Sequence, residues 1–364
     1  MGPLRRQAFS QEFQKRLSPI GKIGVEGMIK KILAGIGITL AVMILAAVGI
    51  KMWADATYFN EYNPKAPFNV NIKEVTLVNQ GDPNKEYQLI HFYFAGVNGE
   101  MVPTLMTIPN KGWEKYPVVI FLHGIGQKKD FLKEITLPFV ETGFAMACID
   151  QLMQGERKLP PEASWLQQYQ AFRKRPARTI NETRRLIDYL SGHPQIDSRR
   201  IYLVGASYGA ITGSTVLAFD KRIRAGILIY GGADIPTMLD APAIRKEAGW
   251  VVTLAKPIAW FCLGVADPKH YAAGIAPTPV YVQAGKRDQL VWPKASQALI
   301  DAIGTPTKVS WYDSDHIGSD RDTNFSNTKQ VLKDGLTWLL EHDAPFRSED
   351  QKVKELPAFE IGDV

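Results

Sequence analysis

A serine stands between two glycines in the segment 205–209, Gly-Ala-Ser-Tyr-Gly. The apolar run 201–204 precedes it, and small residues suited to a helix start follow it. In a sharp turn from a strand into a helix, glycine is needed where a side chain would collide with neighbouring backbone. Such a turn exposes the serine hydroxyl, and the helix N-terminus favours developing negative charge. Ser207 is therefore predicted to be a nucleophile for acyl transfer.

Serine is unreactive without a base, and in this arrangement the base follows the nucleophile along the chain. Of the six histidines, His270, His316 and His342 come after Ser207. His342 follows an apolar helix end, where a positive charge suits the helix dipole. His316 follows the last predicted strand, in a loop at the sheet edge, and is predicted to be the base. His270, in a long intervening segment, is the reserve candidate.

An orienting carboxylate is expected after the penultimate predicted strand, where the sequence places Asp288. It would hold the imidazole in the correct tautomer and stabilise the imidazolium that forms during acyl transfer. Asp234, after the preceding strand, is the alternative acid. Asp313 and Asp315 are too close in sequence to His316 to pair with it comfortably.

Acyl transfer also needs two backbone N–H donors for the oxyanion. One is expected from Tyr208, the residue after the nucleophile. The other is expected from Ile125, because Gly124 and Gly126 let the loop after a buried strand approach closely. Losing one such donor typically costs roughly 3 kcal/mol of transition-state stabilisation. His123, in the same loop, is interpreted as a brace rather than a catalyst.

These residues must be positioned by strands and helices, and the sequence predicts both. The runs 71–78, 87–94 and 101–108 have turn signals between them and are predicted to form an antiparallel start. Six short, almost wholly apolar runs follow, separated by helical segments such as 179–190 and 295–303. That alternation indicates an α/β fold with a mostly parallel sheet covered on both faces. The six runs are 117–122, 144–149, 201–204, 225–229, 280–283 and 308–312.

The expected hydrolase domain covers 70–350 and is followed by a tail, 351–364. Two of its connections, 151–177 and 231–277, are longer than a simple crossover needs. They are expected near the active site. Whether they roof it or extend the core is left open by the sequence.

The N-terminal part predicts a membrane anchor over 32–53, because 32–50 is apolar and uncharged and a bilayer needs about 20 such residues. The preceding segment, 1–31, is basic, which places the N-terminus in the cytoplasm and the catalytic part outside it. A linker is expected over 54–69. The alternative is a secretory signal cleaved near Ala56, since the neighbouring residues are small.

Composition narrows the function classes. The net charge is +6, and much of the excess lies in the N-terminal basic segment, so the folded part offers no basic stripe for a nucleic acid. Cys148 and Cys262 are far apart, show no metal-ligand spacing, and are not expected to form a disulfide. No metal and no cofactor site is predicted.

Over roughly 70–345 the sequence resembles the α/β-hydrolase superfamily, and 188–201 resembles its dienelactone-hydrolase-like branch, near acetyl-xylan esterases and prolyl-oligopeptidase-type peptidases. The motifs that carry the resemblance are Phe-Leu-His-Gly-Ile-Gly at 121–126, the Ser207 elbow, Gly-Lys-Arg-Asp at 285–288, and Asp-His at 315–316. The resemblance implies a hydrolase free of metal and cofactor. Dienelactone hydrolases carry cysteine as nucleophile, so the serine here points to ordinary esters.

The leading expectation is thus a Ser207–His316–Asp288 carboxylic ester hydrolase whose partners are a small acyl ester and, through one helix, a membrane. A peptidase or amidase with the same triad is the second hypothesis. A non-catalytic membrane-anchored protein on the same fold is the third. The sequence names neither substrate nor oligomeric state.

Overall fold

A computed structural model describes residues 3–317 and 321–357. The chain divides between Tyr58 and Phe59 into two compact units. The first is essentially one continuous helix, α1 (Pro3–Ala56). Its stretch Gly27–Ala56 is 30 residues long and strongly apolar, with none of it buried. At 1.5 Å per residue it is about 45 Å long, so it is a candidate membrane span.

The second unit contains a nine-stranded sheet in the order β1-β2-β3-β5-β4-β6-β7-β8-β9. Its first three strands are antiparallel, as predicted: β1 (Asn71–Val78), β2 (Tyr87–Ala95) and β3 (Met101–Pro109). β3 pairs antiparallel with β5, and all later pairs are parallel. The remaining strands are β4 (Tyr116–Leu122), β5 (Ala145–Ile149), β6 (Ile196–Ala206), β7 (Ile223–Ile229), β8 (Val280–Gly285) and β9 (Lys308–Tyr312).

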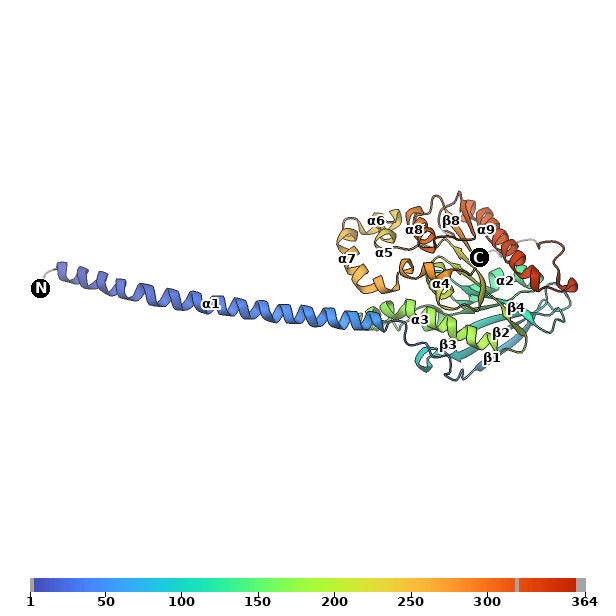
Figure 1. The fold of residues 1–364 in the computed structure, drawn as a ribbon, viewed down its shortest axis with the longest axis horizontal. Coiled ribbons are helices and arrows are strands. Elements are labelled where there is room, and N and C mark those ends of the chain that lie inside the picture. The colour runs from blue at the N-terminus through green and yellow to red at the C-terminus, as the bar shows by residue number, and fades with distance from the viewer. Residues whose placement is uncertain (1–2, 318–320, 358–364) are drawn as a thin grey trace. The chain divides into compact units, whose positions relative to one another are not determined.

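Helices cover both faces of this sheet, because its parallel strands are apolar on both sides (Figure 1). One core cluster joins the sheet to α3 (Trp165–Ser191), α4 (Tyr208–Phe219) and α8 (Pro293–Ile303). The other joins it to α2 (Leu132–Glu141) and α9 (Arg321–Asp343). This is the α/β-hydrolase arrangement that the sequence predicted.

Three further helices occupy the long connection 231–277: α5 (Ile235–Met238), α6 (Pro242–Ala248) and α7 (Val251–Leu263). In the other long connection, 151–177, the residues from Trp165 onward form the first turns of α3. Short 3₁₀ turns complete the chain at Val97–Gly99, Lys129–Phe131, Gly155–Arg157, Gly264–Ala266, Pro268–His270, Ala272–Ile275, Ala344–Phe346 and Glu349–Gln351.

The expected linker 54–69 needs correction, because helix α1 continues to Ala56 and 59–69 packs as part of the second unit. The Phe59 ring lies edge-on to Phe219, with centroids 5.1 Å apart. Arg185 donates to the carbonyl of Ala66 at 2.7 Å. This domain therefore begins at Phe59 rather than at residue 70.

The expected C-terminal tail begins within the fold. Gln351 accepts hydrogen bonds from the guanidinium groups of Arg200 and Arg347 at 3.4 and 2.9 Å. Residue 351 is therefore held by the domain. The part of the predicted tail over 358–364 lies outside the described residues.

Candidate active site

Ser207 lies at the apex of the turn between β6 and α4, with φ of 54° and ψ of −118°. An L-residue adopts this backbone conformation only under strain, and such strain is typical of functional turns. A Cβ on Gly209 would lie 1.8 Å from the carbonyl oxygen of Leu122, and one on Gly205 would lie 2.2 Å from that of Gly209. The two glycines are therefore required by close backbone packing, as the motif predicts.

The structure brings Ser207, His316 and Asp288 together. His316 Nε2 lies 3.0 Å from Ser207 Oγ, and His316 Nδ1 lies 2.7 Å from Asp288 Oδ2. The Asp288 side chain is buried, and its other oxygen accepts from the amides of Leu290 and Val291, each at 2.8 Å. These bonds fix the carboxylate so that Oδ2 faces Nδ1 of the imidazole, which directs Nε2 toward the serine hydroxyl.

The loop that carries His316 is fixed from both sides. Asp315 does not approach the imidazole; its Oδ1 accepts from the amides of Gln289 and His316, at 2.8 and 2.6 Å. On the other side, the buried Tyr230 ring lies edge-on to the imidazole at 5.9 Å, and its hydroxyl is hydrogen-bonded to Ser314. The base is therefore held by packing as well as by its acid.

The reserve candidates lie elsewhere. Asp234 accepts from Lys269 at 3.0 Å and from the Thr237 hydroxyl rather than meeting the imidazole. His270 is exposed and packs edge-on to Tyr271, with centroids 6.2 Å apart. Neither contacts Ser207 among the contacts of the described residues.

The loop 123–127 lies directly beside the serine. A Cβ on Gly124 would meet Ser207 Cβ at 3.3 Å. Gln127 Oε1 accepts from the Gly124 amide at 3.0 Å, and Gln154 Oε1 accepts from the Gly126 amide at 2.7 Å. The amide between these two, that of Ile125, has no acceptor among the described residues. The Ile125 amide is therefore available as a hydrogen-bond donor, whereas the amides of Gly124 and Gly126 are already hydrogen-bonded.

His123 braces this loop, as interpreted from the sequence. Its Nδ1 is 2.9 Å from the carbonyl oxygen of Gly124, and its own carbonyl accepts from Gln151 at 2.8 Å. Burial lowers the pKa of His123, so the imidazole is neutral and Nδ1 donates.

The sequence analysis missed Arg175. Its guanidinium carbon lies 4.3 Å from the ring centroid of Tyr208, and the side chain is 8% exposed. Burial lowers the pKa of Arg175 and raises the pKa of Tyr208 to about 12. A positive charge thus lies beside the second predicted oxyanion residue. In the sequence, Arg-Lys-Arg at 173–175 looks like an ordinary solvated charge run, and burial alone distinguishes its last member.

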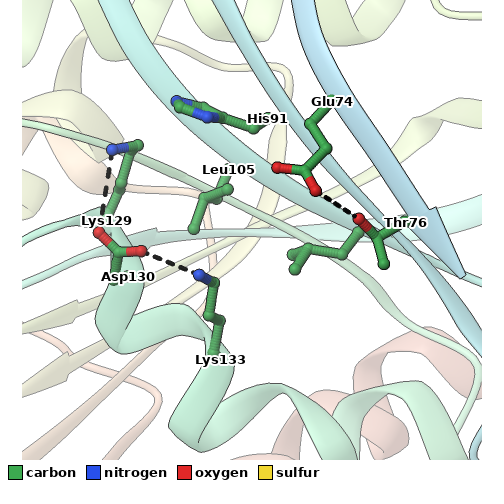
Figure 2. Close-up of a pocket in the computed structure, with 8 residues that line it drawn as sticks. Glu74, Thr76, His91, Leu105, Lys129, Asp130 and Lys133 are labelled. Carbon is green, nitrogen blue, oxygen red and sulfur yellow. Dashed lines mark hydrogen bonds and ion pairs between the residues drawn. The ribbon is translucent and has the colours of Figure 1, made fainter. Parts of the chain in front are cut away.

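Two hollows lie near this edge of the domain. One of about 560 Å³ borders the oxyanion loop at Gly126 and Gln127. A smaller one of about 70 Å³ lies away from Ser207, and Figure 2 shows its charged lining groups meeting one another. There Lys133 Nζ lies 3.0 Å from Asp130 Oδ1, and Thr76 donates to Glu74 at 3.0 Å. In the smaller hollow, Lys133 and Asp130 are thus paired with each other, and the Glu74 carboxylate is hydrogen-bonded to Thr76.

Possible metal ligands do not gather: in residues 3–317 and 321–357, no group of three or more His, Cys, Asp or Glu side chains is placed to hold an ion. Both cysteines are free thiols, Cys148 inside β5 and Cys262 on α7. Cys148 is completely buried and packs as a small core residue.

Comparison with known proteins agrees with the resemblance predicted from the motifs. The family model of the dienelactone hydrolase family matches residues 102–335. Acetyl xylan esterase 1 from Thermoanaerobacterium sp. JW/SL YS485 superposes with a TM-score of 0.60 at 19% identity, over 80% of this chain and 93% of that one. Acetyl xylan esterase from Paenibacillus sp. R4 superposes with a TM-score of 0.58 at 17% identity, over 77% of this chain and 92% of that one. Acylaminoacyl peptidase from Pyrococcus horikoshii gives 0.56 at 16%, over 69% of this chain and 41% of the peptidase.

Proposed function

Because the chain belongs to the dienelactone hydrolase family, and is therefore a hydrolase by family, we propose that it cleaves carboxylic esters through an acyl-enzyme on Ser207. The observation that carries the proposal is the imidazole of His316, placed 3.0 Å from Ser207 Oγ and 2.7 Å from Asp288 Oδ2. This order of nucleophile, base and buried carboxylate is what turns a serine hydroxyl into a nucleophile at neutral pH.

In the first half-reaction, Ser207 Oγ bonds to the carbonyl carbon while its proton passes to His316 Nε2. The carbonyl oxygen becomes an oxyanion, which the amides of Ile125 and Tyr208 stabilise, with the Arg175 charge nearby. When the C–O bond to the alcohol breaks, the alcohol leaves with the proton from His316. In the second half-reaction a water gives its proton to His316, attacks the acyl carbon and releases the acid and Ser207.

Esters are proposed over amides because the superposition covers 93% and 92% of the two acetyl xylan esterases but 41% of the acylaminoacyl peptidase. An amidase or peptidase would use the same side chains, since the difference lies in the substrate pocket and in protonation of the leaving amine. Parallel assays of the full chain with p-nitrophenyl acetate and an aminoacyl p-nitroanilide separate the two. A higher kcat/KM for the anilide would reverse the assignment.

The same preparation tests whether the chain is catalytic at all. A fluorophosphonate reagent is expected to label the wild-type serine and to leave Ser207→Ala unlabelled, with ester turnover lost in parallel. If Ser207→Ala is labelled as strongly as wild type, or if neither protein turns over any ester, the result would instead support a non-catalytic protein on the same fold.

We further propose that α1 is retained as a signal anchor, with the N-terminus in the cytoplasm and the hydrolase unit on the other side. Support comes from the exposed apolar stretch Gly27–Ala56 and from the basic residues that precede it in sequence. Alkaline carbonate should leave the chain in the membrane pellet, and external protease should digest the hydrolase unit in spheroplasts or sealed vesicles of matching orientation. Cleavage near Ala56 would instead release a shortened soluble protein.

A further inference from the structure

Helix α7 has its apolar and polar sides reversed relative to an ordinary surface helix. Val251, Leu254, Ile258 and Phe261 are 50%, 59%, 65% and 46% exposed. At 100° per residue these positions fall on one stripe, and the stripe faces solvent. On the other side, Lys256 turns toward the domain and pairs with Asp240 at 2.5 Å. A helix that meets only water has no reason to expose that stripe.

The first turns of α3 add to the same surface. Trp165, Leu166, Tyr169 and Phe172 are 78%, 47%, 41% and 50% exposed, again at helical spacing. The two helices meet where the Tyr169 hydroxyl lies 3.6 Å from Cys262 Sγ. We name these eight residues, with Trp250 and Trp260, the apolar stripe surface.

Its extent is unusual for a domain facing water. Trp250 and Trp260 are 74% and 56% exposed, and Pro242–Ala248 and Val251–Ala266 form an apolar helix pair that is bent by 114°. Ten large side chains with such exposure present on the order of 1,000 Å² of apolar area. Monomeric soluble domains rarely expose a contiguous patch above a few hundred Å².

The composition of the surface indicates which partner would cover it. Tryptophan and tyrosine are enriched where apolar and aqueous phases meet, because their rings are apolar and carry one polar atom. Cations border the patch: Lys174 and Lys246 are exposed, and Arg245 is exposed although paired with Asp240. Glu247 is the one acidic residue among the exposed side chains of α6. An apolar face with a cationic border suits an anionic lipid surface.

The chain enters the hydrolase unit at Phe59, close to one end of the apolar stripe surface. Two residues separate Ala56, the end of α1, from Phe59, so the distance between Ala56 and Phe59 is at most about 11 Å. Within the hydrolase unit, the Phe59 ring lies 5.4 Å from that of Tyr271, whose hydroxyl donates to the carbonyl of Val265 at 2.6 Å. Val265 follows α7 directly, so the chain joins the unit beside one end of the stripe.

We propose that the apolar stripe surface docks on the face of a phospholipid bilayer, as a second membrane contact independent of α1. The α6 helix also touches the catalytic loops, since the Ala243 amide donates to the carbonyl of Gln289, next to Asp288, at 3.0 Å. Docking therefore places the catalytic edge close to the lipid surface. The proposal rests on anchoring by α1 for proximity and does not depend on which ester is cleaved.

The test uses the full chain in vesicles of phosphatidylcholine and phosphatidylglycerol, with a fluorescent dye on Leu254→Cys in a Cys262→Ser background. The matched control is Ile72→Cys, an equally exposed apolar position on β1, 59% exposed. Lipids brominated in the upper acyl chain are expected to quench roughly half of the emission at position 254 and to leave position 72 unchanged. Ile258→Cys, on the same stripe, repeats the measurement if the first variant fails to fold.

Equal emission and no quenching at both positions would overturn the proposal. So would a dye at position 254 that is shielded from water yet insensitive to bromine, together with disulfide cross-links between chains in an unlabelled sample of the Leu254→Cys variant, because a second copy would then cover the surface. Carbonate extraction of the same vesicles reports on α1 alone. A chain that is extracted refutes the anchor, whereas a chain that stays without quenching refutes the docking.

Discussion

The catalytic edge of the sheet and the apolar stripe surface lie on the same domain but are built in opposite ways. At the catalytic edge the triad side chains meet fixed partners: Asp288 accepts from His316 and from two amides. On α7 the large side chains point away from the domain, and Val252 is the one residue of that helix that is buried. Chemistry requires groups that stay in place before the substrate arrives. A surface for a lipid partner requires apolar side chains that stay exposed to water until the partner binds.

The largest expected effect concerns Asp288, the carboxylate at the catalytic edge. Asp288→Asn should lower kcat for a soluble ester by about 10³–10⁴-fold, because an amide favours the wrong imidazole tautomer and cannot stabilise the imidazolium. Steady-state kinetics with p-nitrophenyl acetate measures it.

Asp315→Asn is the matched control, because Asp315 binds backbone amides and not the imidazole. An amide oxygen still accepts those bonds, so a loss of less than about 10-fold is expected. Equal losses in the two variants would show that the acid is misassigned.

The second prediction concerns packing behind the nucleophile. Gly209→Ala should lower the free energy of unfolding by about 4 kcal/mol or more, because its Cβ would lie 1.8 Å from the Leu122 carbonyl oxygen. Gly213→Ala, in the same helix, would meet a Leu203 methyl group at 3.0 Å, so a change within about 1 kcal/mol is expected. Urea unfolding in detergent compares them. If both alanines are tolerated alike, the close packing described for the elbow is incorrect.

The third prediction compares two positions on α7. Val252→Ser should destabilise by about 2 kcal/mol, because Val252 is 3% exposed and the serine hydroxyl would be buried. Leu254→Ser should change stability by less than about 0.5 kcal/mol, because Leu254 is already 59% exposed. Thermal unfolding in detergent measures both. A large loss for Leu254→Ser would mean that the stripe is packed rather than solvent-facing.

The smallest effect is a pH dependence that originates beside the catalytic loop. Burial lowers the pKa of His123 below its ordinary value, so the unfolded chain binds a proton at mildly acidic pH that the folded chain excludes. Stability should therefore fall as pH drops below about 6.5, by up to about 1.4 kcal/mol per pH unit from this group. His123→Gln should flatten that slope, measured by urea unfolding at a series of pH values. An unchanged slope would assign the acid sensitivity to other groups.

Much of this could be predicted from the sequence. The strands could be predicted because parallel strands buried on both faces are short apolar runs, and because turn signals separate β1, β2 and β3. Ser207 and His316 were found because the motif order places them at one sheet edge. The junction was misplaced because polar and aromatic residues such as Tyr62 resemble a linker until their partner, Asp188 at 2.9 Å, is known.

By itself, the sequence determined the class of fold, the apolar N-terminal helix and the candidate residues Ser207 and His316, because these depend on local pattern and chain order. Only the tertiary structure decided that Asp288 rather than Asp234 meets the imidazole, that Arg175 is buried against Tyr208, and that the apolar side of α7 faces outward. Those outcomes depend on which segments pack against each other. An apolar stripe at helical spacing has the same sequence whether it faces a core or a membrane.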